Sequence, residues 1–151
     1  METTPSRDAA VQALLDKEAI REVLRCYAYA VDQRDLDTVA SCFLPNAEYQ
    51  GSLGTGHIGE ALVAMRERIA RYRSTMHLLA NQHIDLHHDT ATSNTYSIIY
   101  HRFMDEPCNL TVGVRYEDAL VRTNDVWRIA RRVVHQEWQR YDDLLPTEET
   151  P

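Results

Sequence analysis

The sequence predicts one domain of the α+β class, in which helices come first and a curved antiparallel sheet follows. From residue 9 to residue 31, apolar residues recur every three or four positions without Gly or Pro, a pattern typical of an amphipathic helix. After residue 74 the chain changes to long segments rich in Val, Ile, Thr and Tyr, separated by short polar breaks. A length of 151 residues is common for a single domain.

Three helices are expected before the sheet. The apolar stripe of the first helix consists of Val11, Leu14, Leu15, Ile20, Val23, Leu24, Tyr27 and Val31. Asp35 is a candidate N-cap for a second helix over residues 36–43, which should stop before Pro45. A short strand over residues 47–50 and a glycine-marked turn region over residues 51–59 come next. The third helix has Ile58, Leu62, Met65 and Ile69 on one stripe and ends near Tyr72.

The second half of the chain reads as a meander of four long strands, over residues 75–87, 90–104, 111–122 and 126–141. Short turns join antiparallel neighbours, so consecutive strands should pair. Helices laid across the concave face of such a sheet make a cone that encloses a pocket. We expect residues 9–141 to form the domain, residues 1–8 a loose tail and residues 142–151 an acidic tail.

Composition argues against several function classes. The net charge is −7, but four acidic residues fall in the last ten positions, so the folded part is close to neutral and no nucleic-acid partner is expected. Neither a long apolar run nor a secretory leader is present, so we expect no membrane partner. Three widely spaced cysteines favour a reducing, cytoplasmic location over a disulfide framework.

Strand alternation selects the side chains that should face the pocket. The first long strand presents His77, Leu79, Asn81 and His83 on one face, and the second presents Ser97, Ile99, His101 and Phe103. The last strand presents Trp127, Ile129, Arg131, Val133 and His135, provided that no bulge intervenes. His83, Asp85 and His87 would follow His77 on its face. Strand spacing of about 3.3 Å per residue spreads this set too widely for one ion, so no metal is expected.

An ordered set of short motifs runs through most of the chain. It begins with Ala19-Ile20, Tyr27 and Val31-Asp32, and continues with Asp35-Leu36-Asp37, Gly56-x-x-Gly59, His77-x-x-x-Asn81, Gly113-x-x-Tyr116 and Val126-Trp127-Arg128-Ile129. In this order the chain resembles the SnoaL-like family of the nuclear transport factor 2-like superfamily. Within it, the chain is similar to the branch of scytalone dehydratase, bile acid 7α-dehydratase and hexachlorocyclohexane dehydrochlorinase.

The resemblance implies a cofactor-independent lyase of the dehydratase type. It assigns His77 as the base, Asp32 as its partner, Tyr27 and Tyr49 as hydroxyl donors, and His101 as a candidate acid. The substrate would be a small hydrophobic polycyclic, polyketide-like or steroid-like molecule. Side chains expected to line its pocket are Asn81, Ile99, Val114, Val133 and His135. Relatives form dimers or trimers, and the outer face of the sheet needs cover, so we expect a homo-oligomer.

The residue types suit this chemistry without the family. A neutral imidazole is a natural base near pH 7, and a carboxylate on its far nitrogen fixes the tautomer. A polyketide cyclase or isomerase would use the same pair, and a non-catalytic ligand-binding or accessory subunit would use neither residue. Plain structural roles stay open as well: His77 bonded to a backbone carbonyl, Asp32 as a cap, and Tyr27 and Tyr49 in the core. Tyr27 and Asp32 are five residues apart and so do not share a face of their helix.

Overall fold

The computed structural model describes residues 6–143 of the chain. Three helices and six strands follow in the order α1 (Arg7–Gln33), α2 (Leu36–Ser41), β1 (Phe43–Gly51), β2 (Gly54–His57), α3 (Ile58–Ile69), β3 (Tyr72–His87), β4 (Thr90–Phe103), β5 (Cys108–Thr123) and β6 (Val126–Asp143). The α+β prediction is confirmed, with all helices in the first half of the chain. The predicted tails over residues 1–5 and 144–151 lie outside the described residues.

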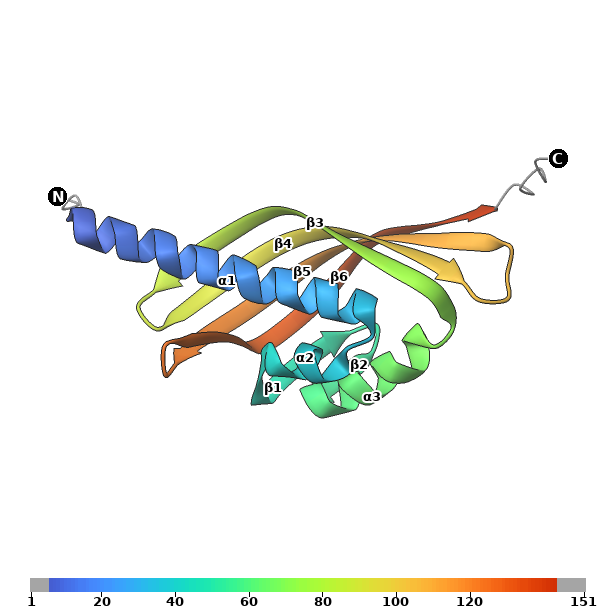
Figure 1. The fold of residues 1–151 in the computed structure, drawn as a ribbon, viewed down its shortest axis with the longest axis horizontal. Helices are drawn as coiled ribbons and strands as arrows, with labels where there is room; N and C mark the ends of the chain where they lie inside the picture. The colour runs from blue at the N-terminus through green and yellow to red at the C-terminus, as the bar shows by residue number, and fades with distance from the viewer. Residues whose placement is uncertain (1–5, 144–151) are drawn as a thin grey trace.

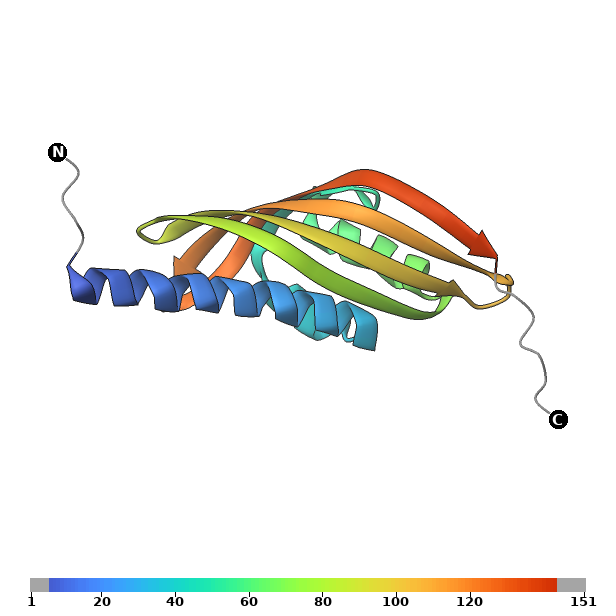
Figure 2. The same cartoon turned by 90° about the horizontal axis from the view of Figure 1, so that it is seen from above.

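The strands form one curved, unclosed sheet in the order β2-β1-β6-β5-β4-β3 (Figure 1). Strands β3 to β6 are the predicted meander, and each pairs antiparallel with the next. The contact between β1 and β6 is parallel, which the prediction of a purely antiparallel sheet lacked. Helix α1 lies lengthwise beside the concave side of the sheet, and α3 lies under the same side near β1 and β2 (Figure 2).

Helix α1 begins at a capping residue, because the side chain of Ser6 accepts a hydrogen bond from the Ala9 amide at 3.3 Å. Its second half is buried against the sheet through Ile20, Leu24, Tyr27, Ala28, Ala30 and Val31. In its first half, the predicted stripe is wrong: Val11, Leu14 and Leu15 are exposed. The first turns of the helix extend beyond the end of the sheet (Figure 2), and the described residues leave these three side chains uncovered.

Between α1 and α3 the chain forms more strand than predicted. Asp35 caps α2 as expected, with its carboxylate accepting from the Thr38 amide at 3.1 Å, but α2 ends at Ser41. Strand β1 starts at Phe43 and accommodates Pro45 where its pairing with β6 shifts register, so no ladder bond is lost there. The predicted turn region contains β2, which pairs with the end of β1.

A bulge in β3 changes which side chains face inward. The pairing with β4 shifts between Leu79 and Gln82, so the inward positions change from odd to even residue numbers. Asn81 is therefore exposed, and its expected place in the pocket is wrong. The same shift leaves His83, Asp85 and His87 exposed on the face opposite to His77.

A second bulge has the same effect in β6. Its pairing with β5 shifts at Ala130, so Arg131 is exposed and Arg132 is buried in its place. Val133 is buried without reaching the pocket, and His135 bonds Glu117 on the outer face at 3.1 Å. The alternation of this strand was predicted on the condition that no bulge intervenes, and because of the bulge it is wrong from Arg131 onward.

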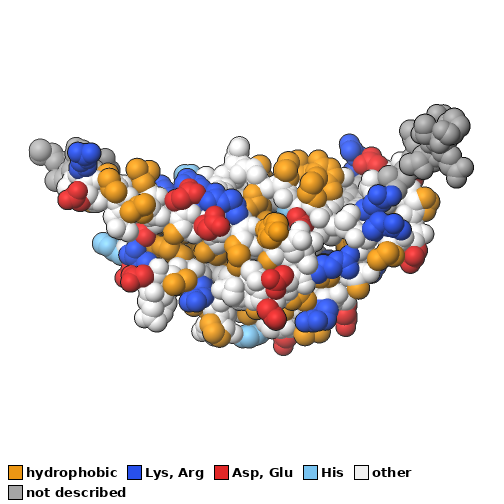
Figure 3. Space-filling view, viewed as in Figure 1, with side chains coloured by type: hydrophobic (Ala, Val, Ile, Leu, Met, Phe, Trp, Pro, Cys, Tyr) orange, Lys and Arg blue, Asp and Glu red, His pale blue; other side chains and the backbone are white. Residues whose placement is uncertain are grey.

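The described residues on the face that carries α1 show no broad area of one charge sign (Figure 3). Acidic and basic side chains are interspersed on the face that carries α1 (Figure 3). Within residues 6–143 no helix is long and apolar enough to cross a membrane.

An arginine at the end of α1 also contacts the start of β3. Arg34 ends the helix in the left-handed conformation at φ 61°, and its guanidinium donates to the backbone carbonyls of Tyr72 and Arg73. We expect Arg34→Met to lower the free energy of unfolding by about 1–2 kcal/mol, because both carbonyls lose a charged donor. Urea unfolding measures the change.

The matched control is Arg25→Met on the same helix. Among the described residues, Arg25 bonds only the exposed carboxylates of Glu18 and Glu22, so its loss should leave the free energy of unfolding nearly unchanged. Equal losses in the two variants would show that the Arg34 carbonyl contacts contribute nothing specific.

Candidate functional site

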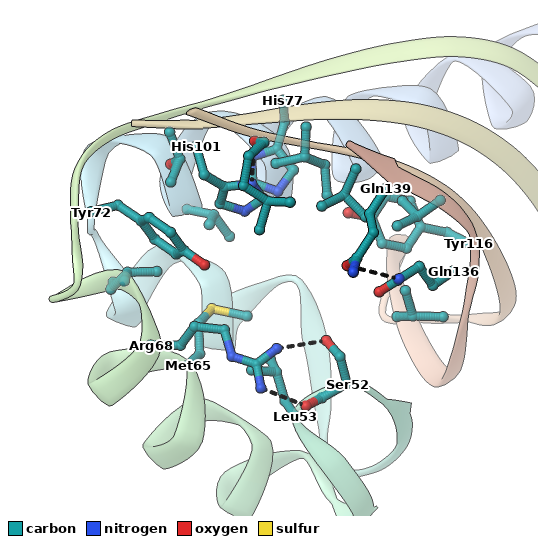
Figure 4. A pocket seen from close by; sticks show the side chains of 18 of the residues that line it. Ser52, Leu53, Met65, Arg68, Tyr72, His77, His101, Tyr116, Gln136 and Gln139 are labelled. Carbon is teal, nitrogen blue, oxygen red and sulfur yellow. Dashed lines mark hydrogen bonds between the residues drawn. The ribbon is translucent and has the colours of Figure 1, made fainter. Parts of the chain in front are cut away.

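A cavity of about 190 Å³ lies between the concave face of the sheet and the helices. Its wall draws on α1, β1, α3 and all four long strands, so residues far apart in the sequence meet there. The close view shows His77 and His101 entering from the sheet side, and Met65 and Arg68 entering from α3 (Figure 4). Most of the wall is apolar, with polar groups at a few positions.

His77 and Asp32 are in direct contact. Nδ1 of His77 lies 2.7 Å from Oδ1 of Asp32, and the backbone amide of His77 donates to Oδ2 at 2.8 Å. The hydroxyl of Thr75 adds a third bond to Oδ1 at 2.9 Å. The imidazole is 6% exposed and the carboxylate 16%, so the pair is largely shielded from water. Asp32 lies behind His77, and His77 lines the cavity.

These hydrogen bonds keep Asp32 ionised and orient the imidazole ring of His77. Burial alone would raise the pKa of Asp32, but the hydrogen bonds from His77 and Thr75 outweigh it and hold that pKa below its ordinary value. Asp32 is therefore a carboxylate that accepts from Nδ1–H of His77. The other ring nitrogen of His77, Nε2, takes no part in this bond and has no hydrogen-bond partner among the described residues.

His101 also lines the cavity, but as a neutral group. Burial lowers its pKa to about 4, although the hydrogen bond to the Leu110 carbonyl opposes this shift. A carbonyl only accepts, so Nδ1 carries the hydrogen in that 3.2 Å contact and Nε2 has the free lone pair. A neutral imidazole in this tautomer accepts a proton and does not supply one. The geometry therefore speaks against His101 as the acid.

Both predicted tyrosines line the cavity. Tyr27 is 5% exposed, and the edge of its ring approaches His77 with centroids 6.5 Å apart. Tyr49 reaches the cavity from β1. Burial raises the pKa of both phenols, so both keep their hydroxyl hydrogen near neutral pH. Tyr27 and Asp32 leave α1 in different directions, and β3 curves past the helix end to meet Asp32.

A buried ion pair lies beneath these tyrosines and was not predicted. Arg132 is 1% exposed and makes two hydrogen bonds to Asp118, at 2.7 and 2.9 Å. Its guanidinium is stacked between the rings of Tyr27 and Tyr116, 4.1 and 4.3 Å from their centroids. The alternation argument selected Arg131 instead. Because Arg128 and Arg131 lie on the same strand, no local pattern in the sequence singled out Arg132.

The remaining predicted lining residues divide into two groups. Ile99 and Val114 lie in the cavity wall, whereas Asn81, Val133 and His135 do not. The prediction also missed polar residues that do line the cavity, and these are Ser52, Arg68, Tyr72, Thr75, Tyr116, Gln136 and Gln139. Gln136 reaches it because the bulge at Ala130 turns even-numbered residues inward, and Gln139 reaches it because β6 is bulged again where it pairs with Gly113 and Val114. Among residues 6–143, no group of three His, Cys, Asp or Glu side chains is placed to hold a metal ion.

The comparisons with known proteins agree with this architecture. Residues 12–133 match the SnoaL-like domain. The chain belongs to the SnoaL-like family. Uncharacterized proteins of Mycobacterium tuberculosis and Mycobacterium bovis are 30% identical to it over 128 residues, which is 82% of this chain and 87% of theirs.

Three solved structures show the same nuclear transport factor 2-like fold. A Novosphingobium aromaticivorans protein provisionally named scytalone dehydratase has a TM-score of 0.80 at 18% identity, covering 94% of this chain and 99% of its own. A hexachlorocyclohexane dehydrochlorinase of type 2 has a TM-score of 0.80 at 17% identity, covering 92% of this chain and 99% of its own. A second N. aromaticivorans protein, provisionally named an aromatic ring hydroxylase, has a TM-score of 0.74 at 25% identity, covering 86% of this chain and 94% of its own.

The buried ion pair gives a test of stability. Removing one partner leaves an unpaired charge in the core, so Asp118→Leu and Arg132→Met should each lower the free energy of unfolding by about 3–5 kcal/mol. The double variant should recover much of that loss, because two apolar side chains need no partner. Urea unfolding of all four proteins measures the coupling, and additive losses would contradict it.

His101 should make stability depend on pH in a defined window. Its pKa is about 4 in the folded protein and about 6.5 in an unfolded chain, so the unfolded state binds the proton first. The contribution of neutral His101 to the free energy of unfolding is fully present above about pH 6.5. It should fall by roughly 2–3 kcal/mol as pH decreases toward 4. Asp32 contributes a further loss only below its ordinary pKa of 3.8.

Unfolding measured at pH 7 and pH 4.5 tests this window. His101→Gln should remove most of the difference, whereas His83→Gln, whose side chain is 77% exposed, should retain it. The assignment fails if the pH dependence of His101→Gln matches that of the unaltered protein.

Proposed function

We propose that this protein is a cofactor-independent lyase that eliminates water, or a comparable leaving group, from a small hydrophobic substrate. The contact that carries the proposal is the 2.7 Å bond between Nδ1 of His77 and Asp32, with Nε2 left free at the cavity. The same fold in a dehydrochlorinase and in a protein named scytalone dehydratase supports a dehydratase-type reaction.

The reaction starts with removal of a C–H proton adjacent to a carbonyl group. Nε2 of His77 takes that proton, and Asp32 stabilises the imidazolium that forms. The C–H electrons form the double bond as the C–O bond breaks. The leaving oxygen then takes the proton back from His77 and departs as water. His77 acts in both steps, since His101 is held neutral with a free lone pair.

Charge that develops on the substrate oxygen needs hydrogen-bond donors. Tyr27 and Tyr49 line the cavity as protonated phenols and take this role. In a site closed to water, one such donor lowers the barrier by about 3 kcal/mol. Arg132 acts through the ring of Tyr27, and it is a positioning residue because it does not line the cavity.

The size of the cavity limits the substrate. Its volume of about 190 Å³ lies below the roughly 300–1,000 Å³ of pockets for drug-sized ligands. We therefore favour a one-ring or two-ring molecule over a complete steroid. An open cavity also argues against the accessory-subunit alternative, which predicts a pocket filled by side chains.

An isomerase or cyclase is the second candidate, and one observation favours it. Since His101 is held neutral, Nε2 of His77 is the one base among the described residues that faces the cavity, and a single base suits the removal of a proton from one carbon and its return to another. The product separates the candidates, because elimination releases the mass of water and isomerisation leaves the substrate mass unchanged.

Self-association through the outer face of the sheet accompanies the proposal. Met76, Leu78, Tyr96, Tyr100 and Trp138 are 40–52% exposed on neighbouring strands, on the face opposite to the cavity. A homodimer or homotrimer would cover them.

Cys26, Cys42 and Cys108 are all free, which supports a reducing, cytoplasmic location.

Proton abstraction is testable before the substrate is known. In D₂O, the protein should accelerate α-proton exchange of two-ring ketones such as 2-tetralone above the buffer rate, as followed by NMR. His77→Gln and Asp32→Asn should each lower this rate by about 10²–10⁴-fold, because base and orienting carboxylate are lost.

His83→Gln is the matched control, since it changes an exposed histidine of the same strand. It should exchange at the rate of the unaltered protein. Circular dichroism establishes that all variants fold. The proposal would end if both His77→Gln and Asp32→Asn exchanged the α-proton at the rate of the unaltered protein. It would also end if the unaltered protein accelerated the exchange of none of the two-ring ketones.

A further inference from the structure

An arginine on α3 enters the cavity on the side opposite to the histidines. Arg68 is half-buried and lies one helical turn from Met65, which also lines the cavity (Figure 4). Nη1 of Arg68 donates to the Ser52 hydroxyl at 2.9 Å, and Nη2 donates to the Ser52 carbonyl at 2.7 Å. These two bonds fix the orientation of the guanidinium at the cavity wall.

The charge of Arg68 is not neutralised by a described acid. Buried Arg132 and half-buried Arg122 both have carboxylate partners within 2.7 Å. Arg68 has no carboxylate partner among residues 6–143, and both groups of Ser52 that it bonds are uncharged. Because Ser52 takes one hydrogen from each terminal nitrogen, other N–H groups of the guanidinium stay available to a ligand.

The cavity wall offers this charge no acidic competitor. Among the described residues that line it, no Asp or Glu occurs, since Asp32 lies behind His77. The charge acts across the cavity. Burial is the main cause of the low pKa of His101, and Arg68 lowers it further. Burial raises the pKa of Tyr72, and Arg68 opposes that rise.

We propose that Arg68, held by Ser52, is a carboxylate-binding subsite that selects substrates with an anionic group at the end remote from the reacting carbon. The planar guanidinium matches the two oxygens of a carboxylate, and the apolar wall between Arg68 and His77 fits the ring system. The inference builds on the proposed function, because it names the substrate class of the same cavity.

Binding of unreactive probes tests the subsite separately from catalysis. The probes are 2-naphthoate and its neutral analogue 2-naphthamide, measured by titration calorimetry. The unaltered protein should bind 2-naphthoate more tightly. Arg68→Met should weaken the binding of 2-naphthoate by about 10–100-fold, because a charge-assisted hydrogen bond is lost. The affinity for 2-naphthamide should change by less than about twofold.

Two controls make the result specific. Arg66→Met removes an exposed arginine of the same helix that does not line the cavity, and it should leave both affinities unchanged. His77→Gln should keep 2-naphthoate binding while losing proton exchange. Failure of the subsite and failure of the proposed function are thereby distinguishable.

An NMR titration of His101 gives an independent readout. A bound carboxylate beside Arg68 cancels part of the positive charge that His101 experiences, so 2-naphthoate should raise its pKa and 2-naphthamide should not. Equal binding of the two probes by the unaltered protein would overturn the subsite. The subsite would also be overturned if Arg68→Met weakened the binding of both probes equally, or if the unaltered protein did not bind 2-naphthoate.

Discussion

The contact between Asp32 and the start of β3 joins the two halves of this protein. One carboxylate in the last turn of α1 accepts hydrogen bonds from the Thr75 hydroxyl, the His77 amide and the His77 ring. Two of these bonds position the strand, and the third orients the imidazole. The same carboxylate therefore connects helix to sheet and leaves Nε2 of His77 directed at the cavity. Structure and proposed chemistry depend on one group.

Electrostatics gives the cavity different properties on its two sides. On the sheet side, burial keeps His101 neutral, and the Asp32 carboxylate is fully engaged by its hydrogen bonds. On the α3 side, Arg68 bonds neutral groups of Ser52, and no carboxylate among residues 6–143 compensates its charge. Arg132 contrasts with Arg68, since its charge is satisfied by Asp118 and it supports Tyr27 from below. A substrate polarised in the same way, with an anion at one end and an acidic C–H at the other, fits this gradient.

The order of the elements and the central pair were accessible from sequence, for local reasons. Helical periodicity located α1 and α3, β-rich runs located the long strands, and Asp35 was correctly expected to cap α2. His77 and Asp32 were paired through an ordered set of motifs. The errors of alternation occurred at bulges. One extra residue in β3 moved Asn81 out of the cavity, and one in β6 exchanged Arg131 for Arg132.

The sequence by itself determined the helices-then-sheet plan, because periodicity is a local property of a chain, whereas His77 and Asp32 were selected through the resemblance to a known family. Tertiary structure alone decided the register after each bulge, the neutrality of His101, and the convergence of Arg68, Tyr72 and Gln136 on one cavity. Those features arise from sheet curvature and burial. Both depend on contacts between segments that are distant in sequence, and no local pattern encodes them.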